Sequence, residues 1–248
     1  MIIRVCGKSK PVPMRDAGRP VVDRVVLLAW VVVFAAPVLG GCSFTEVKEE
    51  ETPIEPVILI DETGKRWDVT TAVNKYGFEV DRFESGLGPR AIEPLIEPEM
   101  LSPGDSGYPA GDAPFPVIGT TINGDARAYG KLDLTDNEIV DDWVGEAPVV
   151  VAYCPPVDMA AVYSRVADGD VVTLSASGWT YDRLFVLYDF ETESLWYRLP
   201  GTNGLTCVAG HYEGLELPEV VSAVEPWNAW RASFPNTKVL AGQFTARR

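Results

Sequence analysis

Residues 134–163 read LTDNEIVDDWVGEAPVVVAYCPPVDMAAVY, a stretch in which a crowd of carboxylates leads into an apolar run. Its middle, residues 147–154, is a continuous apolar run rich in valine that ends at Cys154. Such a run is typical of a β-strand that is buried on both faces. A double proline follows directly and cannot continue the strand. We therefore expect residues 147–154 to form a central strand of a sheet.

Three other segments have the pattern of β-hairpins. Each places a polar or glycine-containing turn between two short runs of β-branched and aromatic residues, and Asn-Gly and Asp-Gly are strong hairpin turns. Successive hairpins predict an antiparallel meander. The three hairpins span residues 116–130, 159–177 and 183–199, with turns at Asn123-Gly124, Asp168-Gly169 and residues 191–194.

Helices are expected in two places only. The pattern of residues 68–77 predicts a helix that Gly77 closes. A second helix opens at residues 225–227 with Pro226 at its first position, carries aromatic residues on one face, and stops at Pro235. Residues 86–116 are rich in proline and glycine and predict a long ordered loop. The predicted fold class is mainly β (α+β), a hairpin-rich antiparallel sheet with a few short helices, one of them C-terminal and packed on the sheet.

Residues 1–41 have the pattern of a lipoprotein-type signal peptide. Six basic residues precede an apolar stretch, residues 25–39, that is shorter than the ~20 residues a membrane-spanning helix needs. Residues 39–42 resemble the bacterial lipobox, in which the cysteine, here Cys42, is lipidated and becomes the new N-terminus. The alternative is an uncleaved anchor helix. Met14 is a second candidate for the start of the chain.

Three parts follow from this interpretation: a signal peptide at 1–41, a lipidated acidic tether at 42–56, and one β-rich domain at 57–248. The tether contains five glutamates and two prolines and few apolar residues, so we expect it to be extended. The protein is then held at the cell envelope, outside the cytoplasm, by its lipid on a bacterial membrane.

The charge of the chain excludes one class of partner. Its formal net charge is −15, and without residues 1–41 it falls to −19, from 34 acidic and 15 basic side chains. Binding of nucleic acid depends on basic groups that neutralise phosphates, so we expect none. Acidic lipid headgroups would also be repelled, which leaves the lipid as the means of membrane attachment. The protein or small-molecule partner is not predicted.

Several longer motifs are similar to those of the DUF3179 family of bacterial and archaeal proteins. The resemblance runs through VIGTTINGDARAYG, NEIVDD, VVVAYCPPVDMAAVY, SGWTYDRLFVLYDFETESLWYRLPG and WNAWRASFPNTKVL, and covers roughly residues 60–240. The family has no established activity to carry over, so the resemblance supports the limits of the domain and its exported, membrane-anchored character.

The resemblance also marks three departures. Family members typically have histidine where this chain has Asn137, a second cysteine where it has Val157, and another histidine where it has Phe234. Each departure replaces a good metal ligand or proton-transfer group by a poor one. If relatives hold a metal or use a nucleophilic thiol, this chain has lost that ability. We therefore expect neither a metal site nor a cofactor.

Three interpretations of Cys154 stay open. The first is an inert thiol buried in an apolar core. The second is a disulfide with Cys207, since after processing these two alone keep free thiols; it would close a loop of some 50 residues and stabilise by about 4 kcal/mol. The third is a reactive thiolate, which the neighbouring carboxylates disfavour because they raise the pKa of a thiol.

The acidic residues around this strand are the other candidates for chemistry. Paired carboxylates can act as acid and base or bind a hard cation. We favour a solvated loop ahead of a strand, with Glu138 and Asp141 as catalytic candidates beside Cys154 if the protein is an enzyme. His211 is expected in a surface turn, and no triad, P-loop or zinc motif is present in the sequence. The cluster comprises Asp133, Asp136, Glu138, Asp141 and Asp142.

Two functions from different classes follow, and enzyme activity is left undecided with a preference against it. The first is a non-catalytic binding or scaffolding domain. The alternative is a metal- or thiol-dependent enzyme with a degenerate site at Cys154 and Glu138, which requires Cys154 to be free and partly exposed. A weaker third is a carbohydrate groove, which requires at least two exposed tryptophans. Its candidates are Trp143, Trp179, Tyr181, Trp196, Tyr197, Trp227 and Trp230.

Overall fold

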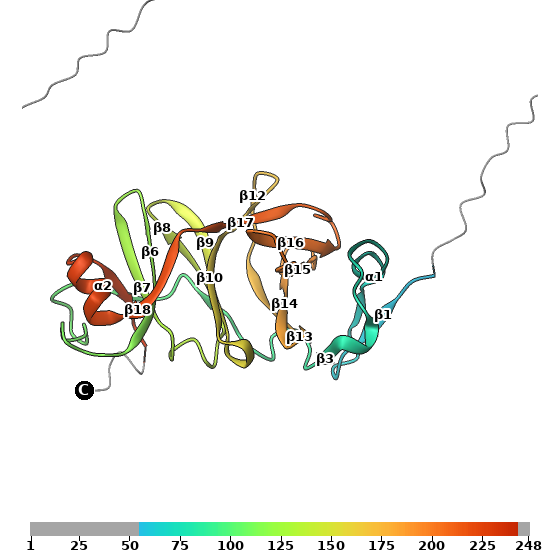
Figure 1. The fold of residues 1–248 in the computed structure, drawn as a ribbon, viewed down its shortest axis with the longest axis horizontal. Helices are drawn as coiled ribbons and strands as arrows, with labels where there is room; N and C mark the ends of the chain where they lie inside the picture. The colour runs from blue at the N-terminus through green and yellow to red at the C-terminus, as the bar shows by residue number, and fades with distance from the viewer. Residues whose placement is uncertain (1–54, 243–248) are drawn as a thin grey trace, which may run out of the picture. The chain divides into compact units, whose positions relative to one another are not determined.

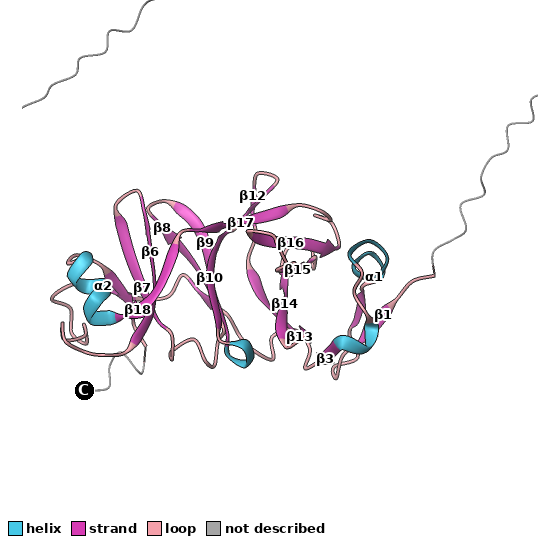
Figure 2. Ribbon diagram, in the orientation of Figure 1, coloured by secondary structure: helices cyan, strands magenta, loops and turns pink. Residues whose placement is uncertain are grey.

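The computed structural model describes residues 55–242. The predicted signal peptide, Cys42 and nearly all of the tether lie outside the described residues. Strands dominate the described part, and helices are few and short (Figure 2). The fold class predicted from the sequence, mainly β with a C-terminal helix, is confirmed.

The largest element is a ten-stranded sheet. All of its pairs are antiparallel except the pair of β4 with β8, which is parallel. In sheet order its strands are β3 (Phe83–Ser85), β13 (Leu174–Tyr181), β14 (Leu184–Asp189), β15 (Leu195–Tyr197), β16 (Gly204–Ala209), β17 (Glu216–Val220), β10 (Met159–Ser164), β9 (Ala147–Cys154), β8 (Ile139–Val144) and β4 (Leu95–Ile96).

A second, five-stranded sheet was not predicted from the sequence. It joins segments from distant parts of the chain, and β19 pairs with β7 in parallel. Its order is β18 (Ser222–Pro226), β6 (Pro116–Ile122), β7 (Asp125–Gly130), β19 (Lys238–Leu240) and β5 (Met100–Leu101). The remaining elements are the ribbons β1 (Ile58–Ile60) with β2 (Arg66–Asp68) and β11 (Val166–Ala167) with β12 (Asp170–Val171), the helices α1 (Thr70–Tyr76) and α2 (Trp227–Ser233), and the 3₁₀ turns η1 (Val80–Arg82) and η2 (Pro155–Val157).

Strand β9 confirms the central strand predicted for residues 147–154. It pairs with β8 on one side and β10 on the other, and both of its faces are buried. Val150, Ala152 and Cys154 point into one core, and Val149, Val151 and Tyr153 into another. Because side chains alternate along a strand, only a continuous apolar run can fill two cores at once.

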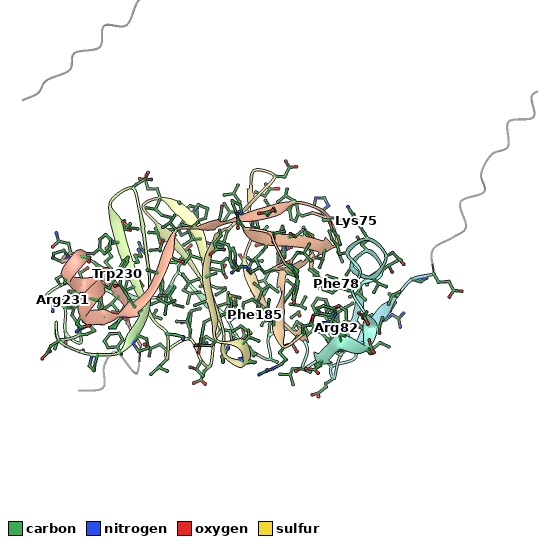
Figure 3. All side chains as sticks on the ribbon, in the orientation of Figure 1. Lys75, Phe78, Arg82, Phe185, Trp230 and Arg231 are labelled. Atoms are coloured by element: carbon green, nitrogen blue, oxygen red, sulfur yellow. The ribbon has the colours of Figure 1, made fainter. Side chains whose placement is uncertain are left out.

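The ten-stranded sheet curls, so that its two halves enclose a shared core. The backbone N–H of Leu174 in β13 donates to Asp141 of β8, although these strands are far apart in the sheet order. We call this the central core. It comprises Ile139, Val150, Ala152, Cys154, Ala161, Tyr163, Ala167, Val172, Leu174, Phe185, Leu187, Trp196, Leu205, Cys207, Tyr212 and Leu217. Figure 3 labels Phe185 at this position, between β10 and the β13–β14 pair.

Three further cores lie between the other layers. The sandwich core joins β8, β9 and β10 to the five-stranded sheet, and includes Ile118, Tyr129, Val151 and Val162. The helix core joins that sheet to α2 through Trp227 and Trp230 (Figures 1 and 3). The N-terminal core packs β2 and α1 on the outer face of β14–β16 through Trp67, Phe78, Tyr188 and Tyr197, among others. The Lys75–Glu213 ion pair, 2.7 Å long, ties α1 to the turn after β16.

Two of the three predicted hairpins are confirmed. β6 and β7 meet at Asn123-Gly124, whose positive φ values of 50° and 82° suit a tight hairpin turn. β14 and β15 pair across the polar turn. The third prediction was wrong in part: at Asp168-Gly169 only the short β11 and β12 pair, while the long flanking strands β10 and β13 pair with other strands. In the ten-stranded sheet β10 pairs with β9 and β17, and β13 pairs with β3 and β14.

The predicted helices are present with small changes at their ends. α1 starts two residues later than expected and ends at Gly77, whose φ of 73° closes it. Pro226 is the N-cap of α2 and not its first helical residue. The predicted loop at 86–116 holds only the two-residue strands β4 and β5 and the start of β6. No helix among residues 55–242 combines the length and the apolar character that a membrane span requires.

Candidate functional site

Cys154 lies at the end of β9, where the strand meets η2. Its side chain faces the central core and is 1% exposed. The thiol donates a long contact of 3.7 Å to the carbonyl oxygen of Arg183. Burial raises the pKa of Cys154, the charge of Glu138 raises it further, and the backbone N–H groups of Phe185 and Val157 oppose the rise. Because the thiolate is the reactive form, this environment makes Cys154 a poor nucleophile near neutral pH.

Glu138 is the carboxylate that the fold brings to Cys154. It precedes β8 with a positive φ of 59°, and its carbonyl oxygen accepts the backbone N–H of Tyr153 at 2.8 Å. Burial raises the pKa of Glu138 to about 7. A half-buried carboxyl whose pKa lies near neutrality and whose charge reaches a thiol is an arrangement that suits proton transfer.

Asp141 is fully buried in β8 and points into the central core. One oxygen accepts the backbone N–H of Leu174 at 3.2 Å and lies 3.4 Å from Nε of Arg165. The other, Oδ2, has no hydrogen-bond partner among the described residues. Burial raises the pKa of Asp141 to about 7, and the Arg165 guanidinium only partly opposes it.

Asp142, the next residue, points to the opposite face and is completely partnered. Arg127 donates to both of its oxygens, at 2.8 and 2.6 Å, and the Tyr129 hydroxyl donates at 2.7 Å. Burial, with the charge of Asp142 next, raises the pKa of Tyr129 well above its usual value. This contact locks β7 of the smaller sheet to β8 of the larger one.

The prediction of a solvated acidic loop was therefore wrong for three of the five residues in the cluster, which are buried. Asp141 and Asp142 are strand residues in two different cores, and Asp133 is also buried. Their cationic partners, Arg165 and Arg127, are distant in sequence, so the segment itself carried no sign of them. Only Asp136 is exposed as expected.

Arg165 is a buried cation that joins three strands and the segment before a fourth. Its guanidinium donates to the backbone carbonyls of Val149 at 2.9 Å, Val172 at 2.9 Å and Asp142 at 3.3 Å. These bonds connect β8, β9 and the end of β10 to the segment that enters β13. The role of this residue is structural, and no motif in the sequence reveals it.

Both described cysteines are free thiols, which differs from the disulfide alternative. Cys207 is fully buried in β16, and its thiol lies 3.3 Å from the carbonyl oxygen of Ala209. Burial raises the pKa of Cys207 to about 12. The two thiols interact with different carbonyl groups, that of Arg183 for Cys154 and that of Ala209 for Cys207.

The three departures from the family motifs fall in two separate places. The Asn137 side chain donates to the carbonyl oxygen of Glu93 at 2.8 Å, and Val157 ends η2 beside Cys154. Both therefore border the Cys154 region. Phe234 instead caps α2 and packs on Trp230, with ring centroids 4.2 Å apart, in the helix core. The structure does not bring this third position to the other two.

The remaining candidates are accounted for by packing. Of the seven aromatic residues proposed for a carbohydrate groove, Trp143 alone is exposed, at 39%, and Trp179 is half-buried. Two exposed tryptophans were required, so that interpretation is not supported. His211 lies exposed in a turn, as expected. Within residues 55–242 no group of three histidine, cysteine or acidic side chains is placed to hold a metal ion.

Sequence reasoning missed a groove of about 570 Å³ between the N-terminal ribbon and the β14–β15 turn. Two matching turns border it. In each, an aspartate accepts the indole N–H of a following tryptophan at 2.8 Å: Trp67 to Asp61 and Trp196 to Asp189. Each aspartate also accepts bonds from a threonine in its turn. The repeated order Asp, Thr, Trp at residues 61–67 and 189–196 is a signal that could have revealed the pair.

An ion pair joins the two turns at the groove. Nζ of Lys65 lies 2.6 Å from Glu193 and also stacks over the Trp67 ring, 4.6 Å from its centroid. Arg66, which is exposed, lines the groove with Thr70 and Thr192, while Leu195 and Ala209 supply apolar surface. The groove thus combines charged side chains, hydroxyl groups and apolar atoms from β2, α1, the β14–β15 turn, β15 and β16, which is the character of a binding surface.

Comparison with known proteins agrees with the motifs. No curated protein and no solved structure matches the chain significantly. The family model DUF3179, described as a protein of unknown function, matches residues 93–248, which is more than half of the chain. The matched part holds Cys154, Glu138 and the buried aspartates, whereas β1, β2 and α1 precede it. The chain therefore belongs to the DUF3179 family.

Proposed function

We propose that this protein is a lipid-anchored domain outside the cytoplasm that binds or scaffolds a partner at the bacterial cell envelope, without catalysis of its own. The anchor rests on the export signal and lipobox-like Cys42 in the sequence. The non-catalytic role rests on what the chemically capable residues do in the fold.

One observation carries the non-catalytic part. The Cys154 thiol is 1% exposed in an apolar core, and its pKa is raised by burial. A nucleophilic cysteine needs access for its substrate and a lowered pKa, usually from a nearby cation. Of the carboxylates, Asp142 accepts hydrogen bonds from Arg127 and Tyr129, and Asp141 accepts one from the backbone N–H of Leu174. These residues support the fold.

The groove beside Arg66 is the best candidate for the binding surface. It is bordered by two turns that the Trp67 and Trp196 hydrogen bonds hold in place. A preformed site loses little conformational entropy when a partner binds. The tether enters the domain here, since Pro56 lines the groove.

A thiol-dependent activity is the second candidate, because one observation favours it. The pKa of Glu138 is raised to about 7, and its charge raises the pKa of Cys154. A proton acceptor and a thiol therefore share one region. For this activity η2 or the Arg183 turn must open to admit a substrate. Labelling of the thiol in the folded protein separates the two candidates.

Anchoring is tested by changing the predicted lipidation site. We expect the full chain expressed in bacteria to partition into the detergent phase and to incorporate labelled palmitate. The Cys42→Ala variant should incorporate none. Equal labelling of Cys42→Ala and the unchanged chain would contradict the lipid anchor, and retention of labelled chain in the cytoplasm would contradict export.

Binding is tested by photo-crosslinking on intact cells. A photoreactive residue at position 66 in the groove should give a discrete crosslinked product, and the same residue at the exposed position 84 on β3 should not. The product should persist in a Cys154→Ala background, because the thiol has no part in binding. Absence of any product specific to position 66 would contradict the groove, and loss of the product in Cys154→Ala would favour the thiol-dependent alternative.

A further inference from the structure

We propose that the outer edge of β18 is a docking site for an extended, positively charged segment of a partner protein, which adds a sixth strand to the five-stranded sheet. This inference rests on the proposed binding function and names a second surface and the chemistry of its partner. The edge is defined by residues 221–226, on the side of β18 that faces away from β6.

The register of β18 shows which of its backbone groups are free. The N–H of Trp227 donates to Phe115 at 2.8 Å, so this pair is hydrogen-bonded. Pro226 opposite Pro116 has no N–H on either side and must be a non-bonded pair. Because the two kinds of pair alternate in an antiparallel ladder, Ala223 and Glu225 bond to β6.

It follows that Ser222 and Val224 turn their N–H and carbonyl groups outward. β18 is the last strand on its side of the five-stranded sheet, so no described strand pairs with this edge. A row of free donors and acceptors of this kind is the template for strand addition. Pro226 blocks the edge only at its end, and its carbonyl serves α2 as the N-cap.

The edge is also apolar and open. Val221 is 88% exposed and Val224 is 51% exposed. Val220 still pairs with Val162 of β10, whereas Ser222 already pairs with Thr120 of β6. The chain thus crosses between sheets at Val221, and a cleft of about 470 Å³ lies along residues 220–222.

Charge determines what kind of strand can occupy this edge. Residues 55–242 carry 30 acidic and 12 basic side chains. Nine of these cations form ion pairs within the protein, including Arg198, which lines the cleft and lies 2.9 Å from Glu219. Glu225 adds a carboxylate on β18 itself. A second copy would bring the same acidic surface and be repelled, whereas a cationic segment would be attracted.

The test uses two synthetic peptides as probes and the full chain in detergent micelles. One peptide alternates lysine and valine, the other alternates glutamate and valine, and both are blocked at their ends. We expect the cationic peptide to slow amide hydrogen exchange at Ser222 and Val224 and to bind more weakly at high salt. Absence of protection at these amides, or equal protection by the acidic peptide, would overturn the proposal.

Two variants locate the binding. Val224→Pro removes an outward N–H without removing a bond to β6 and should weaken cationic-peptide binding about tenfold, as expected for the loss of one such bond. Val224→Thr keeps the N–H and should bind like the unchanged chain. Should Val224→Pro unfold, Glu225→Lys gives an independent test and should also weaken binding. Unchanged binding by a folded Val224→Pro or by Glu225→Lys contradicts the docking site.

Two further results separate the occupants and the proposals. Concentration-dependent dimers that Val224→Pro abolishes would overturn the proposal in favour of a second copy. Loss of the position-66 crosslink with intact peptide binding would contradict the groove as a binding surface and would not affect the β18 docking site. An intact crosslink without peptide binding would do the reverse.

Discussion

The two faces of β8 treat neighbouring aspartates in opposite ways. On the face toward the smaller sheet, Asp142 has an arginine on both oxygens and a tyrosine hydroxyl beside them. On the face toward the central core, Asp141 shares one arginine with three carbonyl groups and leaves Oδ2 without a partner among the described residues. The first arrangement joins two sheets. The second holds a carboxyl at a cost, since a buried charge with incomplete partners is unfavourable.

The other ionisable candidates, Cys154 and Glu138, interact at the central core. The central core also receives Cys154, whose pKa is raised by burial, and Glu138 acts on that thiol. Groups with perturbed pKa values often gather at functional sites. Here burial is the leading cause in each case. Burial therefore raises the pKa values of Asp141, Glu138 and Cys154, and two of these groups, Asp141 and Cys154, are closed off from solvent.

The largest effect is expected on the fully partnered face. Arg127→Met would leave Asp142 buried without its cation, and breaking such a pair costs about 3–5 kcal/mol of unfolding free energy. Urea denaturation at pH 7 measures it. The matched control is Lys238→Met, which removes an exposed cation 3.7 Å from Asp125 and should cost less than about 1 kcal/mol. Equal, small losses for both variants would mean that the Arg127 pair does not hold the sheets together.

The second prediction concerns pH and the central-core face. The pKa of Asp141 is raised from its usual value to about 7 in the folded protein. In the unfolded chain this carboxyl titrates at its usual pKa near 4, so between about pH 4 and pH 7 the folded protein binds more protons than the unfolded chain. The free energy of unfolding therefore falls as pH rises over this range, by up to about 4 kcal/mol in all. Asp141→Asn should remove most of this fall and be more stable than the unchanged chain at pH 8.

Urea denaturation from pH 4.5 to pH 8 measures this slope. Glu138→Gln is the matched control, since Glu138 also titrates near pH 7 but is only half-buried. We expect it to change the slope in the same direction and by less. A slope that Asp141→Asn leaves unaltered would show that Asp141 is ionised throughout and paired with Arg165.

The smallest effect is expected for Cys154. Cys154→Ala removes one buried sulfur from the central core and should cost about 1–2 kcal/mol, without altering the position-66 crosslink. Cys207→Ala, fully buried in the same core, is the matched control and should cost a similar amount. A much larger cost for both variants under oxidising conditions, abolished by reductant, would revive the disulfide alternative.

Local sequence predicted the parts of the fold that local chemistry determines. β9 was predictable because valines fill both of its faces, and the β6–β7 turn because Asn123-Gly124 adopts positive φ. The five-stranded sheet was not, because β18 and β6 are about a hundred residues apart and β19 joins β7 in parallel. Such pairings depend on tertiary packing and leave no periodic signal.

The residues of the candidate site could be predicted from the sequence, but their burial and their partners could not. The sequence singled out Cys154, Glu138 and Asp141, and the fold does bring Glu138 to Cys154. It misplaced Asp141 and Asp142 in solvent, because charged residues in a run such as IVDDWV are usually exposed and their arginines are remote. The groove was missed because it forms between residues 66–71 and 192–195, which meet only in the folded protein.

The non-catalytic role of Cys154 is tested by the rate at which its thiol reacts with iodoacetamide in the folded protein at pH 8. We predict that labelling, followed by intact mass and peptide mapping, is slow, rises with urea in step with unfolding, and matches that of Cys207. Rapid labelling of Cys154 alone, before any unfolding and abolished in Glu138→Gln, would contradict a non-catalytic core thiol and establish the thiol-dependent alternative.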